Sequence, residues 1–345
     1  MRRKPVEVVV VGGGGFGTTL ASLLVELGRS TRLWVRRQEQ ADEVNRSHTN
    51  ERYLPGFRLP PGLAATADLA DAVRGVPVVI VAIPSQRFRE VVRSVGDTLS
   101  GDQVLVHATK GIEIETFKRM SEVLREETCA LKIGVLSGPN LSKEIMAGHP
   151  AGAVVASRYD EVLRAAQGLF AGGRFRLYAG RDVVGVEVAG AFKNVIAIAA
   201  GAADGMGLGD NAKALVLTRG VAEMARLGKA LGGDAATFAG LAGIGDMMAT
   251  CFSPLSRNRG VGARLAAGER MDDILAGMKE VAEGVPTALA VHRQAKKLGI
   301  DMPITRAVHS VLYEGVGARE ALERLSARGV GLEAETIGAR PRAAG

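Results

Sequence analysis

Hydrophobic positions in the first half of the chain form short continuous runs, and these runs alternate with longer amphipathic stretches. Short apolar runs bounded by glycine or proline predict buried strands, whereas the amphipathic stretches predict helices. Strands are expected at residues 8–11, 31–35, 78–83, 103–108, 132–136, 153–156 and 175–178. Helices are expected at residues 18–27, 38–48, 68–73, 88–99 and 115–127. This alternation is typical of an α/β domain with a doubly wound parallel sheet.

The pattern changes near Asp182. Beyond this residue there is little strand signal, and apolar residues recur with helical spacing. Helices are expected at residues 186–200, 211–227, 234–241, 256–267, 287–298, 304–313 and 318–325. The chain therefore predicts an α/β domain over residues 1–185 and an all-α domain over residues 186–330. Residues 331–345 carry several charges without periodicity and are expected to form a loose tail.

Composition limits the class of protein. A length of 345 residues predicts two domains, and an aromatic content of only 4% means that their cores are built from Ala, Val, Leu and Gly. No unbroken run approaches the ~18 apolar residues of a membrane span, so no membrane insertion is expected. Two cysteines, Cys129 and Cys251, cannot form a disulfide framework, which fits a reducing, cytoplasmic compartment. The five histidines lack ligand spacing, so no metal site is expected.

The net charge of +7 raises the question of nucleic-acid binding. The basic residues are scattered among 37 acidic ones, and the only basic block is Arg2 to Lys4. Aromatic residues do not alternate with the basic ones. The charge therefore suits a small anionic ligand better than nucleic acid.

The strand at residues 8–11 leads into Gly12, Gly14 and Gly17, spaced G-x-G-x-x-G at the start of a helix. In this context the spacing is the dinucleotide fingerprint of a Rossmann domain. The first glycine permits the tight turn, the second lets backbone amides approach a pyrophosphate, and the third lets helix and strand pack closely. The N-terminus of the helix then favours the phosphates.

Arg36 and Arg37 follow the second strand, where an NAD-specific site usually has an acidic residue. A guanidinium group suits the 2′-phosphate of NADP, so NADP is favoured as cofactor and NAD is also accepted. The alternative is that these are two solvated surface arginines.

Lys193 interrupts a stripe of small and apolar residues on the helix expected from residue 186. A lysine in such a stripe is unfavourable unless it is paired or functional, and a desolvated lysine is a plausible general acid or base. The alternative is a lysine that reaches solvent or forms a structural pair. Asp246, in the glycine-rich turn 240–246, is placed to hold a lysine ammonium or a substrate hydroxyl, or else to cap a helix.

Ser256, Arg257 and Asn258 begin another expected helix. A hydroxyl, a guanidinium and an amide at a helix N-terminus form a good anion site, although an ordinary capped helix has the same pattern. Asp210 is expected to cap the helix that follows it. Glu283, between two helices, is placed to accept a hydrogen bond from a ribose or nicotinamide group.

The chain resembles the NAD(P)-dependent glycerol-3-phosphate dehydrogenases of the soluble bacterial type. The specific segments are Gly190–Gly201, which contains Lys193-Asn194, and Ser256-Arg-Asn-Arg259. The other matching segments are Gly12–Gly17, Leu33–Arg37, Arg52–Gly56, Ala82–Ser85, Ala108–Gly111, Ser137–Pro139, Gly207–Lys213, Gly240–Asp246 and Glu283-Gly284. The resemblance implies reversible reduction of dihydroxyacetone phosphate to sn-glycerol 3-phosphate for phospholipid synthesis, by a cytoplasmic homodimer.

The resemblance also implies roles for individual residues, with Lys193 as the acid/base. The implied substrate contacts are Lys110, Gly138, Asn140, Lys193, Asp246, Ser256, Arg257 and Asn258. The implied dinucleotide contacts are Gly12, Gly14, Gly15, Phe16, Gly17, Arg36, Arg37, Tyr53, Lys110, Ser142, Arg257, Val281 and Glu283. Asn140 stands where the family usually has a small hydroxyl residue, and Ser142 where alanine is common.

Two other functions are weighed against this one. The first is a two-domain dehydrogenase that acts on a different hydroxy acid or ketone. The second is a catalytically silent NADP-binding regulator, which would have no need of Lys193, Asp246 and Arg257 together.

Overall fold

The computed structural model describes residues 5–278 and 281–329, so the tail expected at 331–345 lies outside the described residues. The chain forms two compact units. The first contains the residues up to Lys110 together with Lys118–Val183, and the second contains Gly111–Phe117 together with the residues from Val184 onward. The sequence places residues 111–117 in the first domain. In the structure they belong to the second unit because Ile112 is buried in its core.

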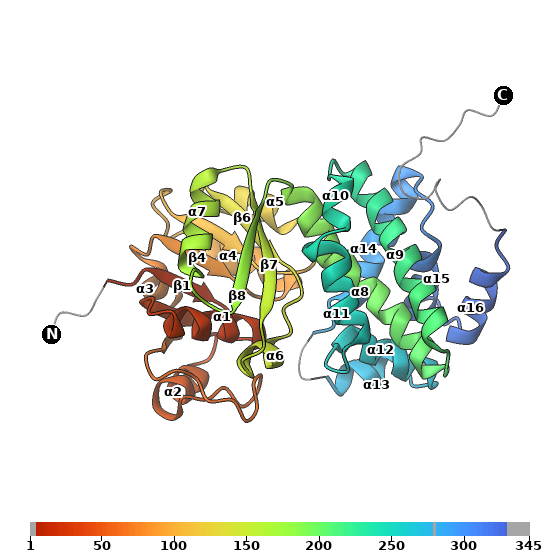
Figure 1. Ribbon diagram of the computed structural model, residues 1–345, viewed down its shortest axis with the longest axis horizontal. Coiled ribbons are helices and arrows are strands. Elements are labelled where there is room, and N and C mark those ends of the chain that lie inside the picture. The colour runs from red at the N-terminus through yellow and green to blue at the C-terminus, as the bar shows by residue number, and fades with distance from the viewer. Residues whose placement is uncertain (1–4, 279–280, 330–345) are drawn as a thin grey trace. The chain divides into compact units, whose positions relative to one another are not determined.

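The first unit, coloured red to yellow-green in Figure 1, is built on a sheet. The sheet has eight strands in the order β3-β2-β1-β4-β5-β6-β7-β8. The strands are β1 (Val8–Val11), β2 (Thr31–Trp34), β3 (Ala64–Thr66), β4 (Val78–Val81), β5 (Val104–His107), β6 (Ile133–Ser137), β7 (Ala151–Ser157) and β8 (Phe175–Gly180). In the register of the central pairs, Val8 lies opposite both Thr31 and Val78. The carboxyl ends of β1, β2 and β4 therefore meet at one edge, where ligands bind in sheets of this kind.

The expectation of a wholly parallel sheet was wrong at one pair, since β7 runs antiparallel to β6. The connection between these strands contains only a five-residue helix, α6 (Ser142–Met146), and the chain turns back without a full crossover helix. Strand β3 was not predicted, because its three residues are too few to show a pattern.

Helices cover the sheet, and each face has its own hydrophobic core. Val8 and Val10 pack into one core and Val9 and Val11 into the other, as the alternation of side chains along a strand requires. The helices of this unit, besides α6, are α1 (Gly15–Glu26), α2 (Gln38–Ser47), α3 (Leu69–Val73), α4 (Phe88–Gly96), α5 (Met120–Glu127) and α7 (Asp160–Leu169).

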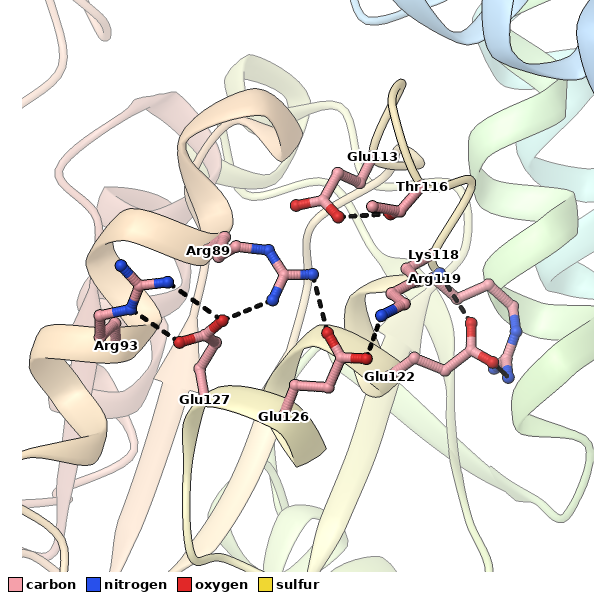
Figure 2. Close-up of polar contacts among 9 residues, drawn as sticks. All are labelled: Arg89, Arg93, Glu113, Thr116, Lys118, Arg119, Glu122, Glu126 and Glu127. Carbon is pink, nitrogen blue, oxygen red and sulfur yellow. Dashed lines mark hydrogen bonds and ion pairs between the residues drawn. The ribbon is translucent and has the colours of Figure 1, made fainter.

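Ion pairs join α4 to α5 (Figure 2). Glu127 accepts hydrogen bonds from Arg93 and Arg89, and these bonds lower the pKa of its carboxyl group to about 2. Glu126 pairs with Arg89 and with Lys118. Lys118 is the residue at which the chain re-enters the first unit. Its ion pair with Glu126 therefore holds this end of the Gly111–Phe117 segment against α5.

Apart from the segment Gly111–Phe117, the described part of the second unit is built from helices and the turns between them, and its core surrounds α8 (Val183–Gly205). The other helices are α9 (Asp210–Ala230), α10 (Ala235–Phe238), α11 (Asp246–Phe252), α12 (Arg257–Ala266), α13 (Met271–Ala276), α14 (Gly284–Leu298), α15 (Pro303–Tyr313) and α16 (Ala318–Ser326). An α/β part followed by an all-helical part confirms the predicted fold class.

By length and composition alone, α8 and the stretch Ala235–Phe252 could each cross a membrane. The most apolar window of α8 is 89% buried inside the protein, which makes α8 a core helix. Its sequence has no unbroken apolar run of spanning length, because Glu187, Lys193 and Asn194 interrupt it.

Candidate active site

The glycine loop between β1 and α1 has the geometry that its spacing predicts. Gly12 has φ +130°, and a Cβ atom there would lie 2.3 Å from the carbonyl oxygen of Ala82. A Cβ atom on Gly17 would lie 1.9 Å from the carbonyl oxygen of Gly12. Gly14 faces open space, and no side chain caps α1. The first backbone N–H groups of α1 are thus directed at an unobstructed position, as a pyrophosphate requires.

Two buried amide side chains hold this loop through hydrogen bonds to its backbone, and neither was predicted from the sequence. Gln40 on α2 donates to the carbonyl oxygen of Gly13 at 2.6 Å, and Asn50 donates to the same oxygen at 3.0 Å. Asn50 also donates to the hydroxyl of Thr18 at 2.9 Å. Both side chains are buried, so they fix the loop from the side away from a ligand. No local spacing points to these residues, since they meet the loop only in the folded chain.

Lys110, after β5, is brought to the predicted contacts Gly138 and Phe16. Its ammonium donates to the carbonyl oxygen of Gly138 at 2.8 Å and lies 6.0 Å from the ring centroid of Phe16. Gly138 has φ +149°, and a Cβ atom there would lie 2.8 Å from Cα of Ala153 on β7. When its amide nitrogen faces Gly138, Asn140 donates to the same carbonyl oxygen. Four residues predicted from the sequence therefore form one group.

The predicted arginine pair follows β2, with Arg36 exposed and Arg37 half-buried. Within residues 5–278 and 281–329, neither side chain forms an ion pair or a hydrogen bond. Both guanidinium groups are therefore available to a phosphate. Tyr53 lies in the loop after α2, with the guanidinium carbon of Arg52 5.7 Å from its ring centroid. Ser142 is the first residue of α6 and is half-buried.

Lys193 lies on α8 and is buried, with 6% of its surface exposed. Its ammonium donates to Oδ1 of Asp246 at 2.5 Å and to the hydroxyl of Thr250 at 2.7 Å. The hydroxyl of Thr250 in turn donates to the backbone carbonyl of Asp246 at 2.6 Å. The sequence identified Lys193 and Asp246 but missed Thr250, which lies one helical turn after Asp246 on the same face of α11.

Asp246 adopts its position because the predicted turn 240–246 is a π-helical turn, Leu241–Gly245, that continues into α11. Its carboxylate is buried and pairs with Lys193, so it does not serve as a cap. Asp210 was wrongly predicted to cap α9. Gly209 occupies the cap position, and Asp210 is the first helical residue, where its charge favours the positive end of the helix dipole.

Asn258 joins three helices through its side chain. Its amide nitrogen donates to Oδ1 of Asn194 on α8 at 2.8 Å, and its own oxygen accepts from the backbone N–H of Gly284 on α14 at 2.9 Å. Gly284 follows Glu283, a predicted cofactor contact. One N–H group and the oxygen of the Asn258 carboxamide are therefore used in protein contacts, and its backbone N–H in the first turn of α12 also suits an anion.

Ser256 caps the start of α12, since its hydroxyl accepts from the N–H of Arg259; this cap was the alternative to an anion site and is compatible with one. Arg257 is exposed and donates to the carbonyl oxygen of Val281 at 3.0 Å. Two predicted dinucleotide contacts, Arg257 and Val281, are thus brought together beside the helix start. A guanidinium at a capped helix N-terminus is a chemically suitable phosphate site.

Other reactive side chains of the described chain belong to the core or the surface. Burial raises the pKa of Cys251 to about 12, so its thiol stays protonated. His107 is fully buried on β5, with its ring edge-on to Phe88 at 5.9 Å. Across residues 5–278 and 281–329, no group of three or more His, Cys, Asp or Glu side chains is arranged to hold a metal ion.

Two family models match most of the chain. The N-terminal model of NAD-dependent glycerol-3-phosphate dehydrogenase matches residues 7–163, and the C-terminal model of the same family matches residues 182–323. The chain belongs to this family. Its sequence is 46% identical over 325 residues to glycerol-3-phosphate dehydrogenase [NAD(P)+] of Nitratidesulfovibrio vulgaris strain DP4, covering 94% of this chain and 98% of the relative.

Other members of the glycerol-3-phosphate dehydrogenase family show the same likeness in sequence and in structure. The enzyme of Acinetobacter baylyi is 45% identical over 314 residues, covering 91% of this chain and 88% of the relative. The crystal structure of glycerol-3-phosphate dehydrogenase from Coxiella burnetii superposes with a TM-score of 0.90 at 34% identity, covering 94% of this chain and all of that one. The family identified from the sequence motifs is therefore confirmed, and the chain is an oxidoreductase.

Proposed function

We propose that this chain reduces dihydroxyacetone phosphate reversibly to sn-glycerol 3-phosphate, with Lys193 as the general acid/base. The reaction is the one named for its relatives. The dinucleotide, when bound, supplies the hydride that adds to C2 of the substrate. What remains for the protein is to bind both molecules, to supply a proton to the C2 oxygen, and to exclude water.

The observation that carries this proposal is the pairing of Lys193 with Asp246 and Thr250. An ammonium group has three N–H donors, and two of them are used by these partners. The third N–H is left for the substrate oxygen. Asp246 holds the ammonium in its orientation, so Lys193 can donate a proton as the C2 oxygen becomes negative and take it back in the reverse reaction.

The other site residues are assigned to the substrate phosphate or to the dinucleotide according to their charge and their place in the fold. The guanidinium of Arg257 and the backbone N–H of Asn258 bind the substrate phosphate at the start of α12. The start of α1 at Gly14 would hold the dinucleotide pyrophosphate, and the Lys110 ammonium beside Phe16 adds a positive charge at that end of the sheet. The Val281 and Glu283 segment is proposed to contact the dinucleotide as well.

A steady-state assay tests the proposed substrate. We expect oxidation of NADPH or NADH to depend on dihydroxyacetone phosphate, with far lower kcat/KM for ketopantoate or hydroxypyruvate. Turnover of either alternative at equal efficiency would favour a different dehydrogenase. Tight NADPH binding without turnover of any of the three would favour the regulator.

Replacing Arg36 and Arg37 together by alanine is expected to weaken NADPH binding by roughly 10–10²-fold, since each lost charge-assisted hydrogen bond is worth about 1.5–3 kcal/mol. NADH lacks the 2′-phosphate, so its dissociation constant should change less than about threefold. Fluorescence titration of both cofactors measures the difference. Arg46→Ala, at the end of α2, is the matched control and should leave both affinities unchanged. Equal losses for NADPH and NADH in the double variant would show that these arginines do not contact the 2′-phosphate.

The homodimer and the cytoplasmic location implied by the family resemblance remain proposals. Light scattering at several protein concentrations tests the first, and cell fractionation tests the second.

A further inference from the structure

The backbones of α8 and α12 touch without side chains between them. A Cβ atom on Gly201 of α8 would lie 1.9 Å from the carbonyl oxygen of Arg259, and one on Gly262 of α12 would lie 1.9 Å from that of Ile198. A Cβ atom on Gly205 would likewise lie 2.5 Å from the carbonyl oxygen of Ala263. Since α8 carries Lys193 and α12 begins with Arg257, this contact sets the separation of the two proposed substrate-binding groups.

Close contact at glycines fixes the distance between the two helices but does not form a hydrogen bond or an ion pair between them. Such polar contacts are made by Asp204, in the last turn of α8. Its Oδ1 accepts from Nζ of Lys213 at 2.6 Å, and its Oδ2 accepts from Nε of Arg259 at 2.5 Å. Lys213 lies in the first turn of α9 and Arg259 in the first turn of α12. One carboxylate therefore ties three helices together.

The electrostatics of Asp204 support a permanent ion pair. Burial raises the pKa of its carboxyl group, but hydrogen bonds from Lys213 and Arg259 outweigh burial and leave the pKa below its usual value. The carboxylate stays ionised at neutral pH and neutralises one of the two cations. Its side chain is 18% exposed, so solvent screens the pairs only partly.

Both cations of this cluster lead to elements that carry the site. The backbone N–H of Arg259 donates to the Ser256 hydroxyl, so the residue anchored by Asp204 belongs to the same turn as Arg257 and Asn258. The Lys213 ammonium lies 5.2 Å from the ring centroid of Phe252, the last residue of α11. Helix α11 also carries Asp246 and Thr250, and it packs against both α9 and α12.

We propose that Asp204 is a positioning residue, which holds the start of α12 and the end of α11 against α8 through Arg259 and Lys213. It thereby fixes the place of the substrate phosphate relative to the Lys193 ammonium. The inference rests on the proposed function, in which the start of α12 binds the substrate phosphate. A small displacement of that start moves the reacting carbon away from the ammonium, and misplacement of about 1 Å can lower a rate 10²-fold.

The test compares two substrates that differ only in the phosphate. Asp204→Asn keeps the shape of the side chain and removes its charge. We expect kcat/KM for dihydroxyacetone phosphate to fall roughly 10–10²-fold, whereas kcat/KM for dihydroxyacetone, measured at high enzyme concentration, stays within about threefold of wild type because that substrate makes no use of the α12 start. The dissociation constant of NADPH should not change.

Glu223→Gln is the matched control. Glu223 on α9 is another buried carboxylate that joins helices, accepting from the N–H groups of Ile304 and Thr305 at the start of α15. The Glu223→Gln substitution is expected to lower Tm without changing the ratio of kcat/KM for dihydroxyacetone phosphate to kcat/KM for dihydroxyacetone. Arg259→Lys provides a second variant if Asp204→Asn does not fold, and it should lower the same ratio to a smaller extent.

Two outcomes would overturn the proposal while leaving the proposed function intact. Equal loss of kcat/KM on both substrates would make Asp204 a general structural residue, and no loss on either would make the cluster irrelevant to the site. Failure of the proposed function gives a different result, namely that wild-type protein does not turn over dihydroxyacetone phosphate.

Discussion

Lys193→Ala is expected to lower kcat for dihydroxyacetone phosphate at least ~10²-fold, the usual contribution of a general acid placed in contact with the reacting oxygen. The structure supports this size of effect because the Lys193 ammonium is buried and is held by Asp246 and Thr250, so no solvent-exposed group takes its place in the alanine variant. Cofactor affinity should be largely retained, since the glycine loop belongs to the other compact unit. Stopped-flow turnover and an NADPH titration of the same preparation measure both quantities.

A control is needed because Lys193→Ala leaves the Asp246 carboxylate buried without its partner, and breaking a buried ion pair from one side costs about 3–5 kcal/mol. Lys193→Met combined with Asp246→Asn removes both charges and should recover much of the lost stability without recovering activity. Near-normal turnover in either variant would exclude Lys193 from the chemistry.

The second large effect is expected for Gly17→Ala. The added methyl group would lie 1.9 Å from the carbonyl oxygen of Gly12, so α1 must move away from the loop that it closes. Overpacking of this kind costs about 1–3 kcal/mol of stability. The displaced N-terminus of α1 should also weaken NADPH binding by at least ~10-fold, because the orientation of its N–H groups toward the pyrophosphate is lost.

Gly14→Ala separates the two causes of that loss. Gly14 has an ordinary φ of −73° and open space where its Cβ atom would lie, so the stability of the free protein should be nearly unchanged. NADPH binding should still fall, because the methyl group occupies the approach of the pyrophosphate. Thermal unfolding with and without NADPH measures both effects. Full NADPH binding by Gly14→Ala would place the pyrophosphate elsewhere.

The parts predicted from sequence are those with a local signal. Strand β1 and the glycine turn were predicted because the valine run and the spacing of Gly12, Gly14 and Gly17 lie within ten residues. Lys193 was found because a charge on an apolar helical stripe is visible in the sequence. Its pairing with Asp246, 53 positions later, was predicted only as one of two roles for that carboxylate.

The parts that were missed depend on contacts between distant segments. Nothing near Asn50 indicates that its amide supports the glycine loop, and nothing near Thr250 indicates a lysine partner. The direction of β7 depends on how the chain packs after β6. Asp210 shows the limit of a local rule, because the helix begins at Asp210 itself, one residue earlier than the capping preference implies, and Gly209 occupies the cap position.

The segment Gly111–Phe117 has a consequence for the order of folding during synthesis. Domains emerging from the ribosome tend to fold from the N-terminus. Here the flanking chain on both sides of the segment belongs to the first unit, while the core that buries Ile112 is assembled from residues that are translated after Val183. Until those residues emerge, Ile112 and Phe117 lack the core against which they pack in the folded protein, so this segment can reach its final position only after the second unit has formed.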